Sequence, residues 1–564
     1  MSADSGKVLG LLARAFELQQ RGQLADAAAL YVDALKLAPD DPTALVNGGV
    51  LALVRGDVSL AVARLDHGAR VAPRNAIARD NLALALLHAG RADDALTASE
   101  AAIALQPRLA TAHNHRGIAL TRLRRNAEAR AAFGQAMALD PRLLAAALNF
   151  GEQANDAGDA REAALAYDRA LALEPGNLHA ATGRAFATAL GGDLTGATRA
   201  LEDTVARAPL HAPAWQTLGA VHNFAWNHDG AEAAFQRALA LTPGAASAQF
   251  GVASARLGKG DFPAGWQAFE QRPDRAADLT ESFAAIPLWD GRDFDGTLVV
   301  HGEQGFGDVL QFARFIPLTR RHVRNVVLLL SGDHAALAPL LATLDADVRV
   351  ITRAEDVPTG APLARISILS LPQRLAIDAH GLAMPAPYLH APGDRAGAWV
   401  HRLAPLPRPR VGLAWSVLAR DVHGFVTRHK SIPPPILAPL LRQDGVSFVT
   451  LQPGPQGDPV AFGRDGARIF DARLFLHDFA DTAALVAQLD LVISADTAVA
   501  HLAGALGVPV WMLDRFNSCW RWRGGTDLSP WYPSMRIFRQ ARFGDWSDVG
   551  ARVGAAFAEL RPKL

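Results

Sequence analysis

The segment AALNFGEQANDAGDAREAALAYDRALALEPGN (146–177) carries the pattern that decides the fold of the first half of the chain. Its proline belongs to a series that recurs every 34 residues, and one of its alanines belongs to a matching series. Proline makes up only about 5% of average sequences, so a series of this length at one phase is not a chance pattern. A fixed period predicts an array of repeated structural units. The prolines are Pro39, Pro73, Pro107, Pro141, Pro175, Pro209 and Pro243, and the alanines are Ala27, Ala61, Ala95, Ala129, Ala163, Ala197 and Ala231.

Each period predicts two closely packed helices. A small residue in the first helix and the fixed alanine in the second let neighbouring helices approach, while a large residue fills the space between units. The proline ends the second helix or opens the next, because it cannot donate the helical hydrogen bond. The small residues are Ala15, Gly49, Ala83, Gly117, Gly151, Ala185 and Gly219, and the large ones are Tyr31, Leu65, Phe133, Tyr167, Leu201 and Phe235, with Ser99 as the exception.

The period, the small positions and the proline resemble the tetratricopeptide repeat over roughly residues 8–245. A degenerate eighth unit, AQFGVASARLGKGDFPAGWQAFEQR, follows at 248–272. The resemblance implies an α solenoid, a superhelix whose first helices line a groove for a protein partner.

Four polar residues share one phase in these first helices and are our candidates for an acceptor-peptide groove: Asn47, Asn81, His115 and Asn149. An amide both donates and accepts, so a ladder of amides can hydrogen-bond an extended peptide backbone. The alternative is that these side chains only satisfy groups within the repeats.

The overall composition excludes several classes of protein. Lys plus Arg total 56 and Asp plus Glu total 56, so no net charge attracts nucleic acid or anionic lipid. The single cysteine, Cys519, excludes an intramolecular disulfide and favours a reducing cytoplasm. The amino-terminal stretch carries Arg14, Glu17 and Arg21 and is interpreted as a helix rather than a signal peptide. No run of about 18 uncharged apolar residues predicts a membrane span.

After about residue 275 the repeat stops, and short apolar runs alternate with helical stretches. This alternation predicts parallel sheets with helical crossovers, whose ligands bind at the carboxyl ends of the strands. The proline- and glycine-rich segment 390–410 is interpreted as a hinge. We therefore expect a repeat domain at 1–275 and two α/β lobes at 283–400 and 401–564. Strands are predicted at 297–302, 325–331, 410–416, 446–452, 491–496 and 508–513.

The first candidate loop is HGEQGFGDVLQFARFIPLT (301–319), in which glycines follow a strand and Asp308 opens a helix. Gly302, Gly305 and Gly307 would allow close approach of the backbone to a ligand, with helix amides facing an anion. The alternative is that these glycines only permit the turn.

The second candidate loop follows the 410–416 run, which ends at Ser416. Arg428, His429 and Lys430 place positive charge shortly before a helix that begins with prolines, as a diphosphate site requires. Solvated surface side chains are the alternative interpretation.

The third loop, in LVISADTAVAHLAGALGVPVWML (491–513), brings a strand end and a helix start together. Asp496 ends the strand, Thr497 starts the helix, and His501 lies on about the same helix face. Capping is the usual use of Asp or Thr at such a place, but capping does not explain His501. The position at the end of a strand therefore favours ligand binding.

Four segments resemble the bacterial glycosyltransferases that join tetratricopeptide repeats to a heptosyltransferase-like catalytic half. They are GEQGFGDVLQFARFIPL (302–318), VGLAWS (411–416) with RHKSIP (428–433), DTAVAHLAGALGVPVW (496–511) and SPWYPSMRIFRQ (529–540). The resemblance covers about residues 285–560. It implies the GT-B fold of two Rossmann-like lobes, with the nucleotide-sugar in the second lobe and the acceptor entering from the first. Similar proteins glycosylate Ser or Thr of proteins held by the repeats, flagellin among them.

The resemblance also implies residue roles. The catalytic base would be Asp308, in a Gly-Asp pair, which would take the proton of the attacking hydroxyl. The resemblance further implies no metal and no cofactor besides the nucleotide-sugar as co-substrate. The residues that would contact the nucleotide-sugar are Gly305, Gly307, Ser416, Lys430, Asp496, Thr497 and His501.

The chain departs from these relatives in two places. Residues 417–427 replace a short polar stretch, and the segment 513–533 differs at its start. In that segment Trp520, Trp522 and Trp531 could stack on a sugar or base, but packing is the commoner role. The departures keep open a second hypothesis, a non-catalytic scaffold whose α/β half is a degenerate transferase and whose repeats recruit partners. A small-molecule or lipopolysaccharide acceptor is a third hypothesis, which leaves the repeats unexplained.

Overall fold

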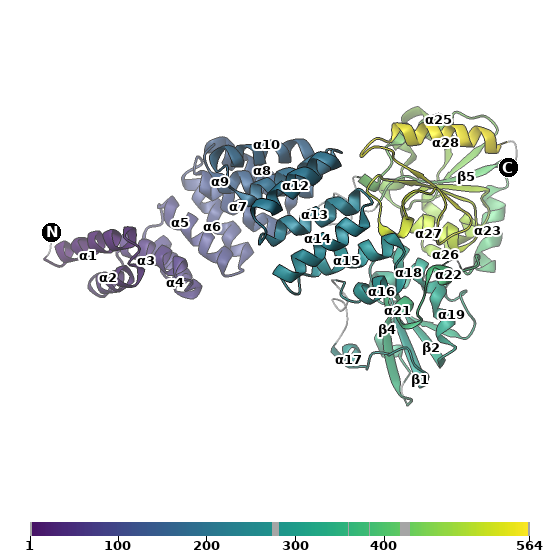
Figure 1. Cartoon of the computed structure of the whole chain (residues 1–564), viewed down its shortest axis with the longest axis horizontal. Helices are drawn as coiled ribbons and strands as arrows, with labels where there is room; N and C mark the ends of the chain where they lie inside the picture. Colours follow the sequence, from purple (N-terminus) through teal and green to yellow (C-terminus); the bar gives the residue numbers. More distant parts are fainter. Residues whose placement is uncertain (1–2, 273–280, 359, 383, 418–428, 562–564) are drawn as a thin grey trace. The chain divides into compact units, whose positions relative to one another are not determined.

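The computed structural model of the chain describes residues 3–272, 281–358, 360–382, 384–417 and 429–561. Figure 1 shows the elements coloured along the sequence. By their internal contacts the residues divide into two compact units, Met1–Ala187 and Thr188–Leu564. The division falls within the repeats, whereas the sequence places the domain boundary near residue 275.

Helices in pairs make up the repeats, as the period predicts. Several first turns are capped by an aspartate; Asp41 and Asp57, for example, accept hydrogen bonds from the amides of Ala44 and Leu60. The first unit contains α1 (Ala3–Gln20), α2 (Leu24–Leu37), α3 (Pro42–Val54), α4 (Val58–Val71), α5 (Ala76–His88), α6 (Ala92–Leu105), α7 (Ala110–Arg122), α8 (Asn126–Leu139), α9 (Leu144–Asp156), α10 (Ala160–Leu173) and the start of α11 (Leu178–Leu190). The second unit continues with α12 (Leu194–Arg207), α13 (Ala212–Phe224), α14 (His228–Leu241), α15 (Ala246–Lys259) and α16 (Phe262–Phe269).

The predicted large residues are buried against the predicted small ones. A Cβ added at Gly117 would lie 2.5 Å from the Phe133 ring, and one added at Gly151 would lie 2.8 Å from the Tyr167 ring. The other face of the Tyr167 ring meets the next repeat, where a Cβ at Gly183 would lie 2.2 Å from it. Tyr167 thus packs against two consecutive helix pairs.

The α/β part of the second unit contains two parallel sheets. The first has the order β3-β2-β1-β4 and the second the order β10-β9-β8-β5-β6-β7. Each pairing between these strands is parallel, for example Leu298 with Val326 and Val411 with Leu491. The strands of the first sheet are β1 (Phe294–His301), β2 (Val323–Leu329), β3 (Val348–Ile351) and β4 (Leu363–Ser367). Those of the second are β5 (Arg410–Ala414), β6 (Ser447–Thr450), β7 (Ile469–Phe470), β8 (Leu491–Ala495), β9 (Val510–Asp514) and β10 (Met535–Arg539).

Helices and 3-10 turns connect these strands. The first sheet region carries α17 (Glu281–Ala284), α18 (Phe306–Phe312), α19 (Ile316–Thr319), α20 (Ala338–Leu341), α21 (Leu371–Arg374) and α22 (Ala379–Leu382). The second carries α23 (Gly393–Leu403), α25 (Pro434–Leu441), α26 (Phe479–Val486), α27 (Ala498–Ala505), the 3-10 turn η8 (Trp520–Trp522) and α28 (Ser547–Leu560).

The segment 390–410, predicted as a hinge between the two lobes, is in part a packed helix. It contains α23, whose Trp399 side chain is buried against Phe475. Arg395 in the same helix pairs with Asp478 at 2.7 Å. The prolines therefore lie outside the helix, while Trp399 within it packs on the second sheet region.

One hydrophobic core explains why the last repeats belong to the same unit as the sheets. It runs from Phe262, Trp266 and Phe269 of α16 into residues of both sheets. The Trp266 ring lies 5.5 Å from that of Trp520, and its Nε1 donates to the carbonyl of Ile377 at 2.9 Å. The degenerate eighth repeat thus serves as part of the core of the α/β region.

Candidate functional site

Both sheets reverse their strand order next to their first strand, which is where parallel sheets open a crevice for ligands. In the first sheet β1 lies between β2 and β4, and in the second β5 lies between β6 and β8. The loops after β1, β5 and β8 are the three loops singled out from the sequence. The structure therefore places all three predicted loops at topological switch points.

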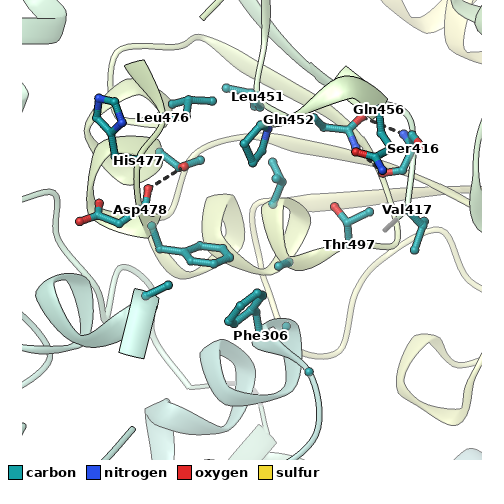
Figure 2. A pocket seen from close by; sticks show the side chains of 18 of the residues that line it. Phe306, Ser416, Val417, Leu451, Gln452, Gln456, Leu476, His477, Asp478 and Thr497 are labelled. Atoms are coloured by element: carbon teal, nitrogen blue, oxygen red, sulfur yellow. Dashed lines mark hydrogen bonds between the residues drawn. The ribbon is translucent and has the colours of Figure 1, made fainter. Parts of the chain in front are cut away.

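These loops line a single cavity of about 670 Å³. Figure 2 shows Phe306 at the start of α18 facing Thr497, Ser416 and Gln452, which belong to the second sheet region. Of the predicted site residues, five line this cavity: Gly305, Gly307, Ser416, Lys430 and Thr497. The other three predicted residues do not line the cavity, but each contacts a residue that does. Asp308 accepts from the Gly305 amide, Asp496 pairs with Lys430, and His501 packs against Gly307.

Asp496 and Lys430 form a buried ion pair, with Lys430 Nζ 2.6 Å from Asp496 Oδ2. Burial opposes ionisation of both groups, but the positive charge of Lys430 holds the pKa of Asp496 well below its usual range. Asp496 in turn raises the pKa of Lys430 against the effect of burial. The two residues were each predicted to contact the nucleotide-sugar; in the structure they pair with each other, and each neutralises the other.

Thr497 is the residue before α27, yet its side chain makes no capping hydrogen bond. Its hydroxyl lies 3.2 Å from that of Ser494 and on the wall of the cavity. Asp496, committed to Lys430, does not cap the helix either. Capping, the alternative interpretation of this pair, is therefore wrong for both side chains.

His501 is buried beneath the cavity. Its Nδ1 lies 3.0 Å from the hydroxyl of Tyr532, and its Nε2 lies 4.0 Å from Asp496 Oδ1. Burial lowers the pKa of His501 to about 4, although the charge of Asp496 opposes the shift. The imidazole is therefore neutral near pH 7.

The loop of residues 302–307, called the glycine loop below, also needs glycine for close packing between helices. A Cβ added at Gly307 would lie 2.8 Å from the His501 ring, so glycine there lets α18 pack against α27. Gly305 precedes α18, and its amide donates to Asp308 Oδ2 at 3.1 Å. The glycine loop, which follows the first sheet, thus packs against the second sheet region at the cavity.

Asp308 is a helix-capping residue in this structure. Besides the Gly305 amide, it accepts from Arg521 Nη2 at 2.5 Å through Oδ1. Arg521 also donates to Gln311 Oε1 at 2.9 Å, and its guanidinium lies over the Trp520 ring. Sequence reasoning missed Arg521, although it lies in the segment 513–533 that sets this chain apart from its relatives.

Gln452 is a second residue that sequence reasoning missed. Its Oε1 accepts from the amides of Trp415 and Ser416 at 2.7 and 2.8 Å, and its Nε2 donates to the carbonyl of Ser416. A polar residue just after β6, beside the switch point, was the available signal, but the sequence interpretation treated it as part of the strand. Gln452 fixes the loop on which Ser416 lies.

The other wall of the cavity is apolar. Phe306 and Phe479 approach to 4.9 Å between ring centroids, and Leu451 and Leu476 lie nearby on the lining. This wall suits a flat or apolar part of a ligand, while the Lys430 side suits its charged part. Trp520, Trp522 and Trp531 are buried among other aromatic rings, in agreement with their packing role.

Three of the four candidates for the peptide groove make contacts inside the repeats. His115 Nδ1 lies 2.7 Å from buried Asp80, Asn149 donates to buried Asn114 at 2.9 Å, and Asn47 bonds the hydroxyl of Tyr31. Asn81 is half-buried. These contacts agree with the alternative of internal satisfaction. The amides retain further hydrogen-bonding capacity, so the groove stays a prediction.

The structure does not describe two features predicted from the sequence, most of the altered loop and Arg428. Residues 418–427 of the altered loop, and Arg428 beside them, lie outside the described residues. Within the described part of the chain, no helix is long and apolar enough to cross a bilayer, and no three His, Cys, Asp or Glu side chains are grouped as metal ligands.

Comparison with known proteins supports the repeats directly. A tetratricopeptide repeat model matches residues 12–66, 49–108, 81–143 and 227–278, so the chain carries these repeats. Protein FlbA of Caulobacter vibrioides is 31% identical over 336 residues, covering 55% of this chain and 55% of FlbA. The chain thus spans about half the length of this curated relative.

Among solved structures, a tetratricopeptide repeat protein of Parabacteroides merdae is 16% identical, with a TM-score of 0.36, over 43% of this chain and 97% of that protein. A thermophilic tetratricopeptide protein of Thermus thermophilus is 25% identical, with a TM-score of 0.29, over 32% of this chain and 99% of that one.

Proposed function

We propose that this chain is a glycosyltransferase that moves a sugar from a nucleotide-sugar to Ser or Thr hydroxyls of a protein held by its repeats. The two sheet regions would be the two lobes of a GT-B fold. The observation that carries the proposal is the cavity at the two switch points, with the Lys430–Asp496 pair and Thr497 on one side and apolar rings on the other. The resemblance of the surrounding segments to glycosyltransferases supplies the reaction.

The reaction needs three things from this site. The acceptor oxygen attacks the anomeric carbon, the bond between that carbon and the diphosphate oxygen breaks with its electron pair, and the hydroxyl proton passes to a base. We assign the base to Asp308, on the basis of the resemblance. The departing diphosphate requires positive charge and free amides, which Lys430 and the start of α27 supply. The Phe306–Phe479 wall is suited to the nucleoside.

The acceptor would be a protein chain, because tetratricopeptide solenoids offer extended surfaces that bind proteins. Flagellin is the first acceptor to test, since related repeat-bearing transferases modify it. The proposal places the reaction in the cytoplasm, where a chain with one cysteine keeps its thiol reduced.

The test replaces Asp496 with alanine in the full chain. Transfer should be abolished, because Lys430 loses the partner that fixes it at the cavity, while far-ultraviolet circular dichroism keeps its native shape. The measurement is intact-protein mass spectrometry of candidate acceptors from cells with and without the chain, which detects a lost glycan mass. Asp444→Ala is the matched control, because the Asp444 side chain is 96% exposed. Full transfer by the Asp496 variant would contradict the assigned site.

A second function is favoured by one observation. Both carboxylate oxygens of Asp308 are engaged, one with Arg521 and one with the Gly305 amide. A degenerate transferase that serves only as a scaffold would tolerate such an arrangement. Absence of saturable binding of any nucleotide-sugar to the wild-type chain would favour this scaffold over the enzyme.

A further inference from the structure

Three cations around the ends of β8 and β9 are paired with carboxylates. Lys430 pairs with Asp496, Arg521 with Asp308 at 2.5 Å, and Arg539 with Asp514 at 3.0 Å. Each of these positive charges already has a partner of opposite sign. A diphosphate carries at least two negative charges, so paired cations alone leave it undercompensated.

Arg515 differs from these three. It directly follows β9, the strand beside β8, so it lies at the carboxyl edge of the second sheet. Its Nη1 atom is buried and has no hydrogen-bond acceptor in the described part of the chain. Its positive charge opposes the rise in the pKa of Lys430 and helps to lower the pKa of Asp496.

The same loop buries a second unused group. The Asn517 side chain is 3% exposed, and neither its oxygen nor its nitrogen has a partner among the described residues. Buried amides and guanidinium groups are normally hydrogen-bonded, and leaving one unpaired is costly. Unpaired polar groups gathered on one loop at the carboxyl edge of a parallel sheet indicate a place where a ligand supplies the missing partner.

We propose that Arg515 binds the diphosphate of the donor, in an anion subsite on the loop after β9. The identity of the donor rests on the proposed function, whereas the binding of an anion by Arg515 does not. Arg515 is not the ion-pair partner of any of the three carboxylates named above. Its guanidinium is a planar fork of donors that suits phosphate oxygens. Lys430, held by Asp496, then serves mainly to shape the site. Sequence reasoning assigned the diphosphate to Lys430, with Arg428 and His429 beside it, because Arg515 lies outside the segments that carry the resemblance.

The test uses the full chain and isothermal titration calorimetry. The probes are inorganic pyrophosphate, the diphosphates of uridine, guanosine, adenosine, cytidine and thymidine, and the matching nucleosides. For Arg515→Gln we expect affinity for pyrophosphate and for the tightest nucleoside diphosphate to fall about tenfold or more, since a charge-assisted hydrogen bond is lost. Affinity for the nucleoside alone should not change. Arg515→Lys should recover part of the loss, and Arg464→Gln, an exposed arginine, is the matched control.

The outcomes separate the two proposals. Equal diphosphate affinity in Arg515→Gln and the wild type would overturn the subsite while leaving the transferase intact. An equal loss for diphosphate and nucleoside would also overturn it, because it would show a structural role. Pyrophosphate binding that depends on Arg515, without binding of any nucleoside diphosphate, would support the subsite and contradict the proposed donor. No binding of any probe to the wild type would contradict both.

Discussion

His501 shows at the scale of one residue how burial and charge act together in this site. Its ring occupies the space that a side chain at position 307 would need, contacts Tyr532, and lies near the Lys430–Asp496 pair. Because the ring is kept neutral by burial, the cavity side of the site holds one ion pair rather than an additional positive charge. A protonated ring would add an uncompensated charge to a closed space.

This burial predicts a pH dependence of stability. The pKa of His501 is about 4 in the folded chain and about 6.5 in the unfolded chain, so between these values the unfolded state binds more protons. The stabilising effect is fully present above about pH 6.5 and is lost as the pH falls toward 4. Between pH 7 and pH 5 we expect His501 to account for a loss of about 2 kcal/mol in the free energy of unfolding.

Urea unfolding at the two pH values measures this effect. His501→Gln should show a smaller loss than the wild type, although a dependence remains because burial lowers the pKa of His301 to about 4 as well. His380→Gln, at an exposed position, is the control. An unchanged loss in the His501 variant would show that His501 does not titrate in this way.

At the scale of the element, the repeats depend on close approach between helices around one large side chain. The Tyr167 ring lies between Gly151 of its own repeat and Gly183 of the next. Any side chain at either position must displace the ring, which is fully buried and has no room to move. The repeat pattern of small and large residues is therefore a packing requirement.

Gly183→Ala tests this requirement. A Cβ there would lie 2.2 Å from the Tyr167 ring, so we expect the free energy of unfolding to fall by about 1–3 kcal/mol despite the better helix propensity of alanine. Denaturant unfolding followed by circular dichroism is the measurement. Gly10→Ala is the matched control, since Gly10 lies in a helix with open space around it, and it should stabilise by up to about 1 kcal/mol. Equal effects at both positions would refute the packing argument.

The strands show which elements a sequence reveals. Each strand predicted from an apolar run is an interior strand, namely β1, β2, β5, β6, β8 and β9. The strands that were missed, β3, β4, β7 and β10, are the edges of the two sheets. Interior parallel strands are covered on both faces and read as continuous apolar runs. Edge strands here carry charged residues such as Arg349, Arg365 and Arg536, or are only two residues long, so their signal is weak.

At the scale of the whole molecule, the last two repeat helices belong physically to the sheets. Besides the aromatic contacts of α16, Arg272 forms a bidentate pair with buried Glu303, at 2.6 Å for each contact, just after β1. Glu303 begins the glycine loop of the candidate site. The end of the solenoid thus supports the site from beneath.

Truncation tests this arrangement. A fragment of residues 191–564, which starts after α11, should fold cooperatively and bind ligand as the full chain does. A fragment of residues 285–564 lacks Trp266, Phe269 and Arg272, and leaves Glu303 buried without its partner. We expect it to lose more than about 5 kcal/mol of stability or to be insoluble. Thermal unfolding of the two fragments is the measurement, and equal melting temperatures would contradict the shared core.

The sequence by itself determined the repeat array, its packing rule, the interior strands and the three loops at their ends. These features are set by local sequence, because a helix pair of fixed length leaves a regular period in the chain and a strand covered on both faces leaves a continuous apolar run. The tertiary structure alone decided that Asp308 meets Arg521, that Gln452 holds Ser416, that Arg515 has a buried Nη1 without an acceptor among the described residues, and that the last repeat completes the core. Such contacts join residues far apart in sequence, and their energies depend on burial and on neighbouring charges, which no local pattern records.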